Sequence, residues 1–297
     1  MGFKEDLSAF THAKIHIGEP MKKHTAFGVG GRADYYIEPE SLYALCEALS
    51  TCKRYKVSYK VIGNGTNVLV SDKGYRGLVI NVKKINSIFV DKNSVRVMAG
   101  APLFSLIKTV SEKGLSGLEW ASGIPATVGG AVVMNAGAFG HSISERVSVV
   151  ETLFDGKIKK YDGSECKFAY RTSRFLGKKE IVVSTTFTLD SADKDEIKER
   201  INAYRELRVA VQPNGRSCGS VFKNPKGYTA GKLIESAGLK GSTIGGAKVS
   251  TKHANFILVE GKTCARDIAE LIDYVKRRVY TKYNVLLKEE IEYVGEF

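Results

Sequence analysis

Gly28-Val29-Gly30-Gly31-Arg32-Ala33 is the stretch that decides which kind of fold this chain can adopt. It fits the pattern G-x-G-x-x-A, which binds a dinucleotide where it joins a strand to the N-terminus of a helix. Here the glycines are followed by Asp34-Tyr35-Tyr36-Ile37-Glu38-Pro39, which is typical of a strand. Because no helix N-terminus follows, the sequence argues against a doubly wound dinucleotide-binding domain.

Beyond this stretch, helical and strand-like patterns mix along the whole chain. Ser41 is a candidate N-cap for the first helix, and Gly114 lies just past the end of the second. Apolar residues recur at helical spacing in 42–49, 103–110, 192–208, 229–237 and 264–282. Runs rich in β-branched residues predict strands at 57–62, 77–82, 86–90, 94–98, 147–154, 181–189, 255–260 and 284–294. Since strands and helices do not alternate strictly, the predicted class is α+β.

Length and composition indicate a globular protein without a membrane span. The 297 residues suffice for two or three domains, and 43% hydrophobic with 26% charged residues is ordinary. No apolar run reaches about 18 residues, and the N-terminal residues 1–6 lack a signal-peptide core, so we expect a cytoplasmic protein. The five cysteines are odd in number and scattered, which predicts reduced thiols and neither a disulfide framework nor a metal site.

The net charge of +13 is the one unusual bulk property. Nucleic acid is the first partner that such a charge suggests. The basic residues are spread along the chain, however, and the densest cluster, Lys276-Arg277-Arg278, lies on an amphipathic helix whose outer face is solvated. We therefore expect no nucleic-acid partner. Small ligands with several phosphates fit the charge equally well, because a positive field raises their rate of encounter.

A second glycine-rich stretch, Gly63-Asn64-Gly65-Thr66-Asn67, lies between the apolar runs 59–62 and 68–70. Backbone amides exposed by glycines, with Asn and Thr side chains beside them, can line an anion-binding concavity. Asn-Gly is also a strong turn signal. Taken alone, the stretch favours a plain turn between two strands.

A third glycine-rich stretch holds small residues at almost every position. It runs from Ser122-Gly123-Ile124-Pro125 through Gly129-Gly130 to Asn135-Ala136-Gly137-Ala138. Small residues would let the backbone lie against a flat or extended ligand, and tight packing in a core is the alternative. Three such stretches in one half of the chain favour a large nucleotide cofactor.

Three stretches far apart in the sequence supply a proton donor, a fixed cation and a carboxylic acid. They are Gly219-Ser220-Val221-Phe222-Lys223-Asn224-Pro225, Ala169-Tyr170-Arg171-Thr172-Ser173-Arg174-Phe175 and Glu289-Glu290-Ile291. Adding a hydride and then a proton to a carbon–carbon double bond needs such a set. Read from composition alone, a surface ion pair for Arg171, a turn for Ser220 and a strand edge for Glu290 are the simpler interpretations.

Taken together and in order, these motifs resemble those of the UDP-N-acetylenolpyruvylglucosamine reductases, flavoenzymes of bacterial cell-wall synthesis. The resemblance covers nearly the whole chain and is carried by the motifs at 63–72, 123–137, 170–171, 219–225 and 290–291. No extra segment separates 222–225 from the helix at 229–237, so the chain resembles the shorter type of the family, without an inserted loop that closes over substrate.

The resemblance implies a fold and a domain order. We expect an FAD-binding fold of the vanillyl-alcohol-oxidase type, with subdomains at 1–85 and 86–205, and an α+β substrate-binding domain at 206–297. FAD would be held noncovalently, with NADPH as the reductant. The expected cofactor-binding residues are Gly63, Asn64, Gly65, Thr66, Asn67, Ser122, Gly123, Ile124, Pro125, Gly129, Gly130, Asn135, Gly137 and Ala138.

The resemblance also implies the substrate, UDP-N-acetylglucosamine enolpyruvate, and a role for each catalytic residue. Arg171 would stabilise the charge that develops beside the substrate carboxylate, and Glu290, kept protonated, would assist. Ser220 would give a proton to carbon, helped by Lys223 or a water. A flavin oxidase of the same fold is the rival, but oxidation of an alcohol needs a base rather than a proton donor.

Residues that would grip the UDP-sugar are expected beside the catalytic ones. The candidates are Tyr170, Lys223, Asn224, Lys252, His253 and Asn255, with a structural role the stronger interpretation for His253. Relatives usually carry a lysine before the Gln212-Pro213 pair, where this chain has Val211, so Arg208 or Arg216 would have to supply a phosphate contact. The sequence leaves the oligomeric state open, with a monomer as the working expectation.

Overall fold

The computed structural model describes residues 2–297, which form two compact units, and each is described by itself. Among the described residues, the first unit comprises 2–16, 35–64 and 77–208, and the second comprises 17–34, 65–76 and 209–297. A four-stranded sheet has the order β1-β2-β5-β3, and the chain passes between the units inside three of its strands. These three are β1 (His16–Pro20), β2 (Arg32–Ile37) and β5 (Tyr75–Asn81). The strand expected directly after the first glycine stretch is therefore confirmed as β2.

The first unit contains most of the strands. Its helices are α1 (Phe3–Thr11), α2 (Leu42–Tyr55), α3 (Leu103–Glu112), α4 (Val128–Met134) and most of α5 (Lys194–Val211). Its strands are β3 (Tyr59–Ile62), β6 (Ile88–Asp91), β7 (Ser94–Met98), β8 (Leu115–Ser116), β9 (Gly137–Ala138), β10 (His141–Ser142), β11 (Val147–Phe154), β12 (Lys157–Asp162), β13 (Ile181–Thr188) and β14 (Asp190–Ser191).

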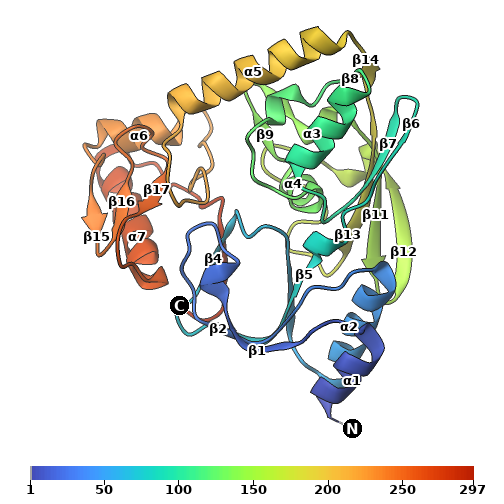
Figure 1. The fold of residues 1–297 in the computed structure, drawn as a ribbon. Coiled ribbons are helices and arrows are strands. Elements are labelled where there is room, and N and C mark those ends of the chain that lie inside the picture. The colour runs from blue at the N-terminus through green and yellow to red at the C-terminus, as the bar shows by residue number, and fades with distance from the viewer. Residues whose placement is uncertain (1) are drawn as a thin grey trace. The chain divides into compact units, whose positions relative to one another are not determined.

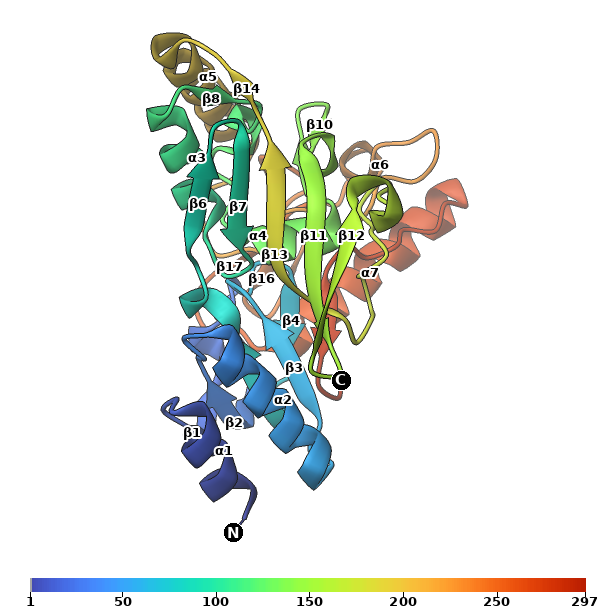
Figure 2. The ribbon, with the colours of Figure 1, turned by 90° about the vertical axis from the view of Figure 1, so that its right-hand side faces the viewer.

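An antiparallel sheet of five strands, in the order β12-β11-β13-β7-β6, organises this unit, and Figure 2 looks onto it. Helices α3 and α4 lie on one face of the sheet (Figure 1). Buried side chains such as Val95, Val97 and Leu106 fill the space between these layers. Because β7 alternates exposed and buried residues, one of its faces points into this core.

All five expected helices are confirmed, and two helices were missed. Ser41 Oγ accepts a hydrogen bond from the Ala44 N–H at 3.1 Å, which confirms the predicted N-cap of α2. Helix α1 was missed although Leu7 and Thr11, one turn apart, are buried on one of its faces. Helix α4 was missed because Gly129 and Gly130, poor helix formers, lie in its first turn.

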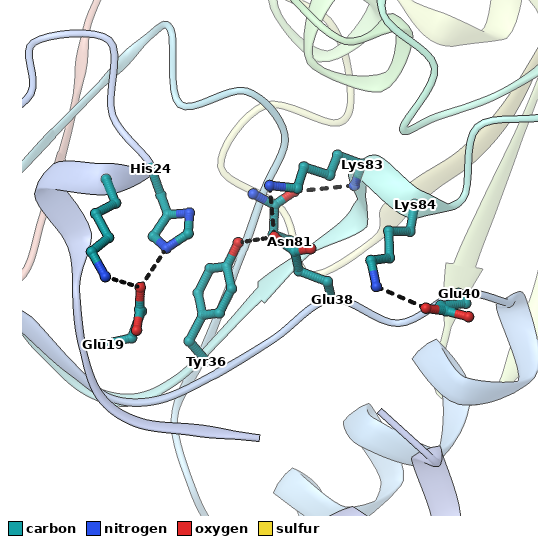
Figure 3. Close-up of polar contacts among 9 residues, drawn as sticks. Glu19, His24, Tyr36, Glu38, Glu40, Asn81, Lys83 and Lys84 are labelled. Carbon is teal, nitrogen blue, oxygen red and sulfur yellow. Dashed lines mark hydrogen bonds and ion pairs between the residues drawn. The ribbon is translucent and has the colours of Figure 1, made fainter. Parts of the chain in front are cut away.

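The strand end before α2 is fixed by polar contacts (Figure 3). The Tyr36 hydroxyl donates to a Glu38 carboxylate oxygen at 2.6 Å, and the Lys83 ammonium lies 2.7 Å from the same oxygen. Lys84 pairs with Glu40 at 2.7 Å. Burial alone would raise the pKa of Glu38, but the hydrogen bonds from Lys83 and Tyr36 together hold it below its usual value. These contacts connect the segment between β2 and α2 to the segment after β5.

The second unit contains two helices, a three-stranded sheet of order β15-β16-β17 and the parallel pair β4 and β18. The elements are α6 (Ala230–Ser236), α7 (Ala265–Tyr283), β4 (Val68–Val70), β15 (Thr243–Ile244), β16 (Ala247–Val249), β17 (Ile257–Val259) and β18 (Glu292–Val294). One face of α7, including Ile268, Leu271 and Val275, packs into the same core as Val221 and Phe222. The core of this unit therefore supports the serine motif directly.

All eight expected strands overlap observed strands, but the one expected at 284–294 does so only over its last three residues, so most of that prediction is wrong. Asn284 ends α7 in the left-handed conformation, and only Glu292–Val294 forms a strand. Leu287 and Ile291 are buried as the pattern suggested, but this segment meets Phe222 only through an isolated bridge at Glu289. The apolar pattern of 284–294 therefore reflects buried side chains in a segment that has no continuous partner strand.

Within residues 2–297, no helix is both long and apolar enough to cross a membrane. The same residues contain no group of three or more His, Cys, Asp or Glu side chains arranged to hold a metal ion. All five cysteines are free thiols. Burial raises the pKa of Cys52 and of Cys218 to about 12, so both stay protonated near neutral pH.

Candidate active site

Arg171 lies in a tight turn in the first unit. Ala169 and Thr172 exchange two backbone hydrogen bonds of 3.1 Å, so Tyr170 and Arg171 form the tip of the turn. Arg171 has a φ of +52°, a left-handed conformation that a long side chain rarely adopts. Such a conformation persists only where the surrounding structure holds it, and it is found most often at functional sites.

Two neighbours orient the Arg171 side chain. Its Nη2 donates a hydrogen bond to the Gly137 carbonyl at 2.7 Å, and its guanidinium carbon lies 5.4 Å from the centre of the Tyr170 ring. Gly137 belongs to the third glycine-rich stretch. The structure thus brings a predicted cofactor residue, Gly137, into contact with the predicted catalytic cation.

Asn135 supports the same turn. It ends α4 in the left-handed conformation, its Nδ2 donates to the Ala169 carbonyl at 2.9 Å, and its Oδ1 accepts from the Ser144 N–H at 3.3 Å. The side chain is buried. These contacts make Asn135 a support for the Arg171 turn, and its predicted contact with a cofactor stays a prediction.

The second and third glycine-rich stretches meet in the first unit. Asn64 Nδ2 donates a hydrogen bond to the Pro125 carbonyl at 3.0 Å. A Cβ on Gly63 would lie 2.2 Å from Thr127 Oγ1, so only glycine fits there. The predicted turn between the strands at 59–62 and 68–70 is present, but the two strands do not pair with each other, because β3 pairs with β5 and β4 pairs with β18.

Ser122 lies beside the meeting point of the two glycine-rich stretches and has a side chain suited to a ligand. Its side chain is 2% exposed, and its Oγ has no hydrogen-bond partner among residues 2–297. A buried hydroxyl without a partner is costly. It lies on the loop that continues to Pro125, beside Asn64. A nucleotide, rich in hydrogen-bonding groups, would satisfy it, so these residues fit an FAD cofactor.

Arg208, near the C-terminal end of α5, was considered only as a phosphate contact. Its Nε donates to the Ser122 carbonyl at 2.9 Å and its Nη2 to the Trp120 carbonyl at 3.2 Å. Its guanidinium carbon lies 5.2 Å from the centre of the Phe139 ring, and burial lowers its pKa. Arg208 therefore clamps the loop that carries Ser122 and Gly123. No sequence pattern indicates this role.

In the second unit, the serine motif lies between two other segments. The Val221 N–H donates to the Asn255 carbonyl at 2.8 Å, and the Val221 carbonyl accepts from the Glu290 N–H at 2.7 Å. Ser220 also forms an isolated bridge with Phe256. The structure thus brings the Ser220 and Glu290 segments together within one unit.

Asn67 connects the second glycine-rich stretch to Glu290. Asn67 Nδ2 donates to the Glu290 carbonyl at 3.0 Å, and the Asn67 carbonyl accepts from the Glu292 N–H at 2.9 Å. Nearby, Gly65 has a φ of +64°, and a Cβ there would lie 1.9 Å from the His24 carbonyl oxygen. A residue predicted to bind the cofactor therefore fixes the backbone on both sides of Ile291.

Asn255 and His253 form the support beneath the serine motif. Asn255 is buried, with Oδ1 accepting from the Phe222 N–H at 2.9 Å and Nδ2 donating to the Phe222 carbonyl at 2.8 Å. His253 Nδ1 accepts from the Asn255 N–H at 3.2 Å, and burial lowers the pKa of His253. A neutral ring that accepts at Nδ1 carries its proton on Nε2.

The remaining candidate substrate residues also have partners inside their own unit. Asn224 Oδ1 accepts from the Ala230 N–H at 2.9 Å, which satisfies the first turn of α6. Lys252 Nζ donates to the Val209 carbonyl at 2.6 Å. The Lys223 N–H donates to the Lys288 carbonyl at 2.9 Å, and Tyr170 is 54% exposed in the first unit.

Family models match most of the chain. Residues 33–160 match an FAD binding domain, and residues 212–294 match the UDP-N-acetylenolpyruvoylglucosamine reductase C-terminal domain. The UDP-N-acetylenolpyruvoylglucosamine reductase of Carboxydothermus hydrogenoformans is 42% identical over 296 residues, covering 99% of this chain and 98% of its own. That of Halalkalibacterium halodurans is 40% identical over 295 residues, covering 98% of each chain.

Solved structures give the same result for the fold. The crystal structure of a UDP-N-acetylenolpyruvylglucosamine reductase from Thermus caldophilus superimposes with a TM-score of 0.81 at 35% identity, covering 95% of this chain and 99% of its own. A berberine bridge enzyme variant, a reticuline dehydrogenase, gives a TM-score of 0.52 at 14% identity, over 65% of this chain and 44% of its own. The second likeness bears on the fold alone. With the FAD domain match, it confirms the predicted α+β fold of the vanillyl-alcohol-oxidase type.

Proposed function

The chain belongs to the UDP-N-acetylenolpyruvoylglucosamine reductase family, and we propose that Arg171, Ser220 and Glu290 carry out its chemistry. It is an FAD-containing, NADPH-dependent oxidoreductase, a UDP-N-acetylmuramate dehydrogenase. It reduces the enolpyruvyl double bond of UDP-N-acetylglucosamine enolpyruvate to give UDP-N-acetylmuramate, a peptidoglycan precursor. Identity of about 40% over nearly the full length carries this assignment.

When bound, the FAD supplies the hydride, taken from NADPH, that adds to the methylene carbon of the enolpyruvyl group. Ser122, Asn64 and the loop ending at Pro125 would hold it in the first unit. The buried Ser122 hydroxyl and the Arg208 clamp on the same loop support this assignment. The other expected cofactor residues, including Gly129, Gly130 and Ala138, remain part of the proposal.

Arg171 would stabilise the negative charge that develops on the carbon next to the carboxylate and on the carboxylate itself. The planar guanidinium can grip a carboxylate through two parallel hydrogen bonds. Its contacts with Gly137 and Tyr170 hold the side chain before substrate arrives, and preorganised charge is what lowers a barrier of this kind. The strained backbone at Arg171 supports the same role.

Ser220 would give its hydroxyl proton to the carbon that bears the carboxylate, once hydride has been added to the methylene carbon. A bond from oxygen to hydrogen breaks and a bond from carbon to hydrogen forms. Gly219, with a φ of +76° and no atom within 4 Å of a would-be Cβ, leaves space beside this serine. Lys223, or an ordered water, would offset the charge left on the serine oxygen.

Glu290 would donate a hydrogen bond to the substrate oxygen that gains charge, which requires a protonated carboxyl group. Its backbone is held by Val221 on one side and by Asn67 on the other. Both contacts restrict where the carboxyl group can lie. Its neighbour Glu289 has a separate role, since it pairs with Lys276 at 2.6 Å.

The substrate-binding set and the surroundings of the enzyme complete the proposal. Tyr170 and Lys223 are proposed to contact the UDP-sugar. Asn224, Lys252, His253 and Asn255 stay candidates for the same contact, and each also has a partner that holds it in its own segment. We also propose two FAD-binding subdomains, at 1–85 and 86–205, followed by a substrate-binding domain at 206–297. We further propose that the protein is cytoplasmic. The proposed monomeric state would be tested by sedimentation.

Anaerobic rapid mixing tests the function directly. NADPH should bleach the flavin absorbance of the purified yellow protein, and UDP-N-acetylglucosamine enolpyruvate should restore it with formation of UDP-N-acetylmuramate. Bleaching by an alcohol or a sugar, with restoration by oxygen alone, would instead identify an oxidase of the same fold. Colourless protein that retains nucleic acid would contradict the flavoenzyme outright.

A further inference from the structure

A basic hollow in the first unit has no part in the site described above. It lies beside the turn of β11 into β12 and along the loop that follows, and its volume is about 500 Å³. Its lining residues are Phe154, Lys167, Arg174, Lys178, Lys179 and Glu180. None of them belongs to the predicted catalytic, cofactor or substrate sets.

The hollow carries four cations and one carboxylate. Glu180 accepts a hydrogen bond from the Tyr161 hydroxyl at 3.0 Å. In the part of the chain that the structure describes, Lys167, Lys178, Lys179 and Arg174 have no carboxylate within ion-pair distance. Like charges that share one concavity repel each other, so an anion bound there would relieve the repulsion.

Arg174 is the rigid member of the set. Its backbone N–H donates to the Cys166 carbonyl at 2.9 Å, and its side-chain Nη1 donates to the Glu165 carbonyl at 3.2 Å. Its guanidinium carbon lies 3.9 Å from the centre of the Tyr161 ring. A stacked guanidinium loses little freedom when it binds a ligand. The three lysines are exposed and can adjust around it.

We propose that this hollow binds an anion that carries several phosphate groups. A planar guanidinium and three ammonium groups are suited to phosphate oxygens, and four cations match a ligand with three or more negative charges. A second hollow, on α7, is of similar size but is lined by both Glu270 and Asp273 and by Lys276 and Arg277. That balance of charge gives the second hollow no preference for anions.

Such a ligand would also restrain the loop that carries Arg171. The hydrogen bond from Arg174 to Cys166 closes a loop whose tip is the Ala169–Thr172 turn. Lys167 and Arg174 lie on opposite stems of that loop, so a ligand held by both would tie the stems together. Any effect of the bound anion on turnover rests on the proposed role of Arg171, whereas binding of the anion does not depend on that role.

Titration of the FAD-loaded protein with inorganic tripolyphosphate at low ionic strength tests the proposal. Calorimetry should show saturable binding of one ligand that weakens as salt is added. The double variant Lys178→Gln/Lys179→Gln should bind about tenfold more weakly or worse, since two charge-assisted contacts are lost. Lys113→Gln/Lys198→Gln removes the same charge from exposed positions outside the hollow and should bind normally. Hydrogen exchange of residues 166–180 should slow with ligand in the parent and not in the first variant.

The outcomes separate the proposal from its rivals. No saturable binding, or equal loss of affinity in both double variants, would overturn it. So would tight binding of a single-stranded oligonucleotide through the same lysines without binding of tripolyphosphate, which would assign the surface to nucleic acid. Sedimentation with phosphatidylglycerol vesicles, compared with free tripolyphosphate, identifies a lipid headgroup or a soluble phosphate as the source. Flavin reduction by NADPH without added phosphate should be equal in all variants. A failure of the anion-binding proposal can therefore be told apart from a failure of the catalytic proposal.

Discussion

The Glu290 backbone N–H donates a hydrogen bond to the Val221 carbonyl at 2.7 Å. Ser220 precedes Val221 directly, so the proposed proton donor and the proposed acid share one backbone connection. Val221 also donates its own N–H to Asn255, and its side chain is fully buried. Ser220 and Glu290 therefore keep their positions as long as this small part of the core is intact. The effects of substituting their side chains on activity can then be attributed to the chemical step.

Replacing Ser220 by alanine should remove the proton donor and leave the rest of the site in place. Reduction of the flavin by NADPH should proceed at its normal rate. Reoxidation by the enolpyruvyl substrate should slow by about 10²–10⁴-fold, the usual contribution of a positioned acid. Anaerobic stopped-flow absorbance separates the two half-reactions. Near-normal turnover would show that the proton comes from elsewhere, and Ser236→Ala, at an exposed serine on α6, is the matched control.

Two variants of Glu290 separate hydrogen-bond donation from negative charge. Glutamine keeps a donor at nearly the same distance, whereas aspartate keeps the carboxyl group but shortens the side chain. If donation matters, Glu290→Gln should retain more activity than Glu290→Asp in steady-state kinetics. The reverse order would mean that the carboxylate acts in its charged form.

Glu289→Gln is the control for this pair of variants. It breaks the contact with Lys276, which is partly exposed, and ion pairs of this kind contribute about 0–1 kcal/mol. Turnover by Glu289→Gln should therefore be close to normal, with at most a small change in stability. A large loss of activity would instead implicate Glu289 in the chemistry.

The sequence predicted the elements with strong periodicity and missed those defined by tertiary contacts. Helix α7 and strand β11 follow directly from their patterns, whereas Gly129 and Gly130 concealed α4. The motif residues Arg171, Ser220 and Glu290 were identified by their resemblance to a family. No residue preference indicated the left-handed backbone of Arg171, and the clamp formed by Arg208 depends on residues distant in sequence.

Asn255 shows the same limit within the site. As an exposed amide it would be a reasonable ligand for a sugar, but its two hydrogen bonds to Phe222 make it a substitute for a missing strand partner. The sequence around Asn255 did not predict that its side chain is buried. The fold therefore shows which candidate substrate residues are held by hydrogen bonds within the protein, which the sequence did not.

Asn255→Ala should destabilise the protein more than it impairs binding. Both backbone groups of buried Phe222 would lose their partner, at an expected cost on the order of 2–4 kcal/mol. Urea unfolding followed by circular dichroism measures the change. Asn214→Ala, in an exposed loop, should change the stability little. A stable Asn255→Ala protein with a greatly raised KM would support direct substrate contact instead.

His253 should make stability depend on pH. Burial holds its pKa below the usual value of 6.5, so the folded protein prefers the neutral ring. This contribution is complete above about pH 6.5 and is lost as the pH falls through the lowered folded-state pKa. His253→Asn keeps an acceptor without titrating, so its thermal midpoint should fall less steeply than that of the parent between pH 7 and 5. His12→Asn, at an exposed histidine, should follow the parent; identical profiles for all three proteins would contradict this role of His253.

Arg208→Lys should weaken FAD binding without touching the proposed catalytic residues. A lysine keeps the charge but cannot donate to the Ser122 and Trp120 carbonyls together, so the loop that carries the buried Ser122 hydroxyl should loosen. We expect a rise of about tenfold in the FAD dissociation constant, equivalent to the loss of one good hydrogen bond to a charged group. Flavin fluorescence on dilution measures this constant directly. Arg205→Lys, three residues earlier on α5 and exposed, is the matched control and should bind FAD normally. Equal affinity in both variants would mean that Ser122 keeps its position without the clamp.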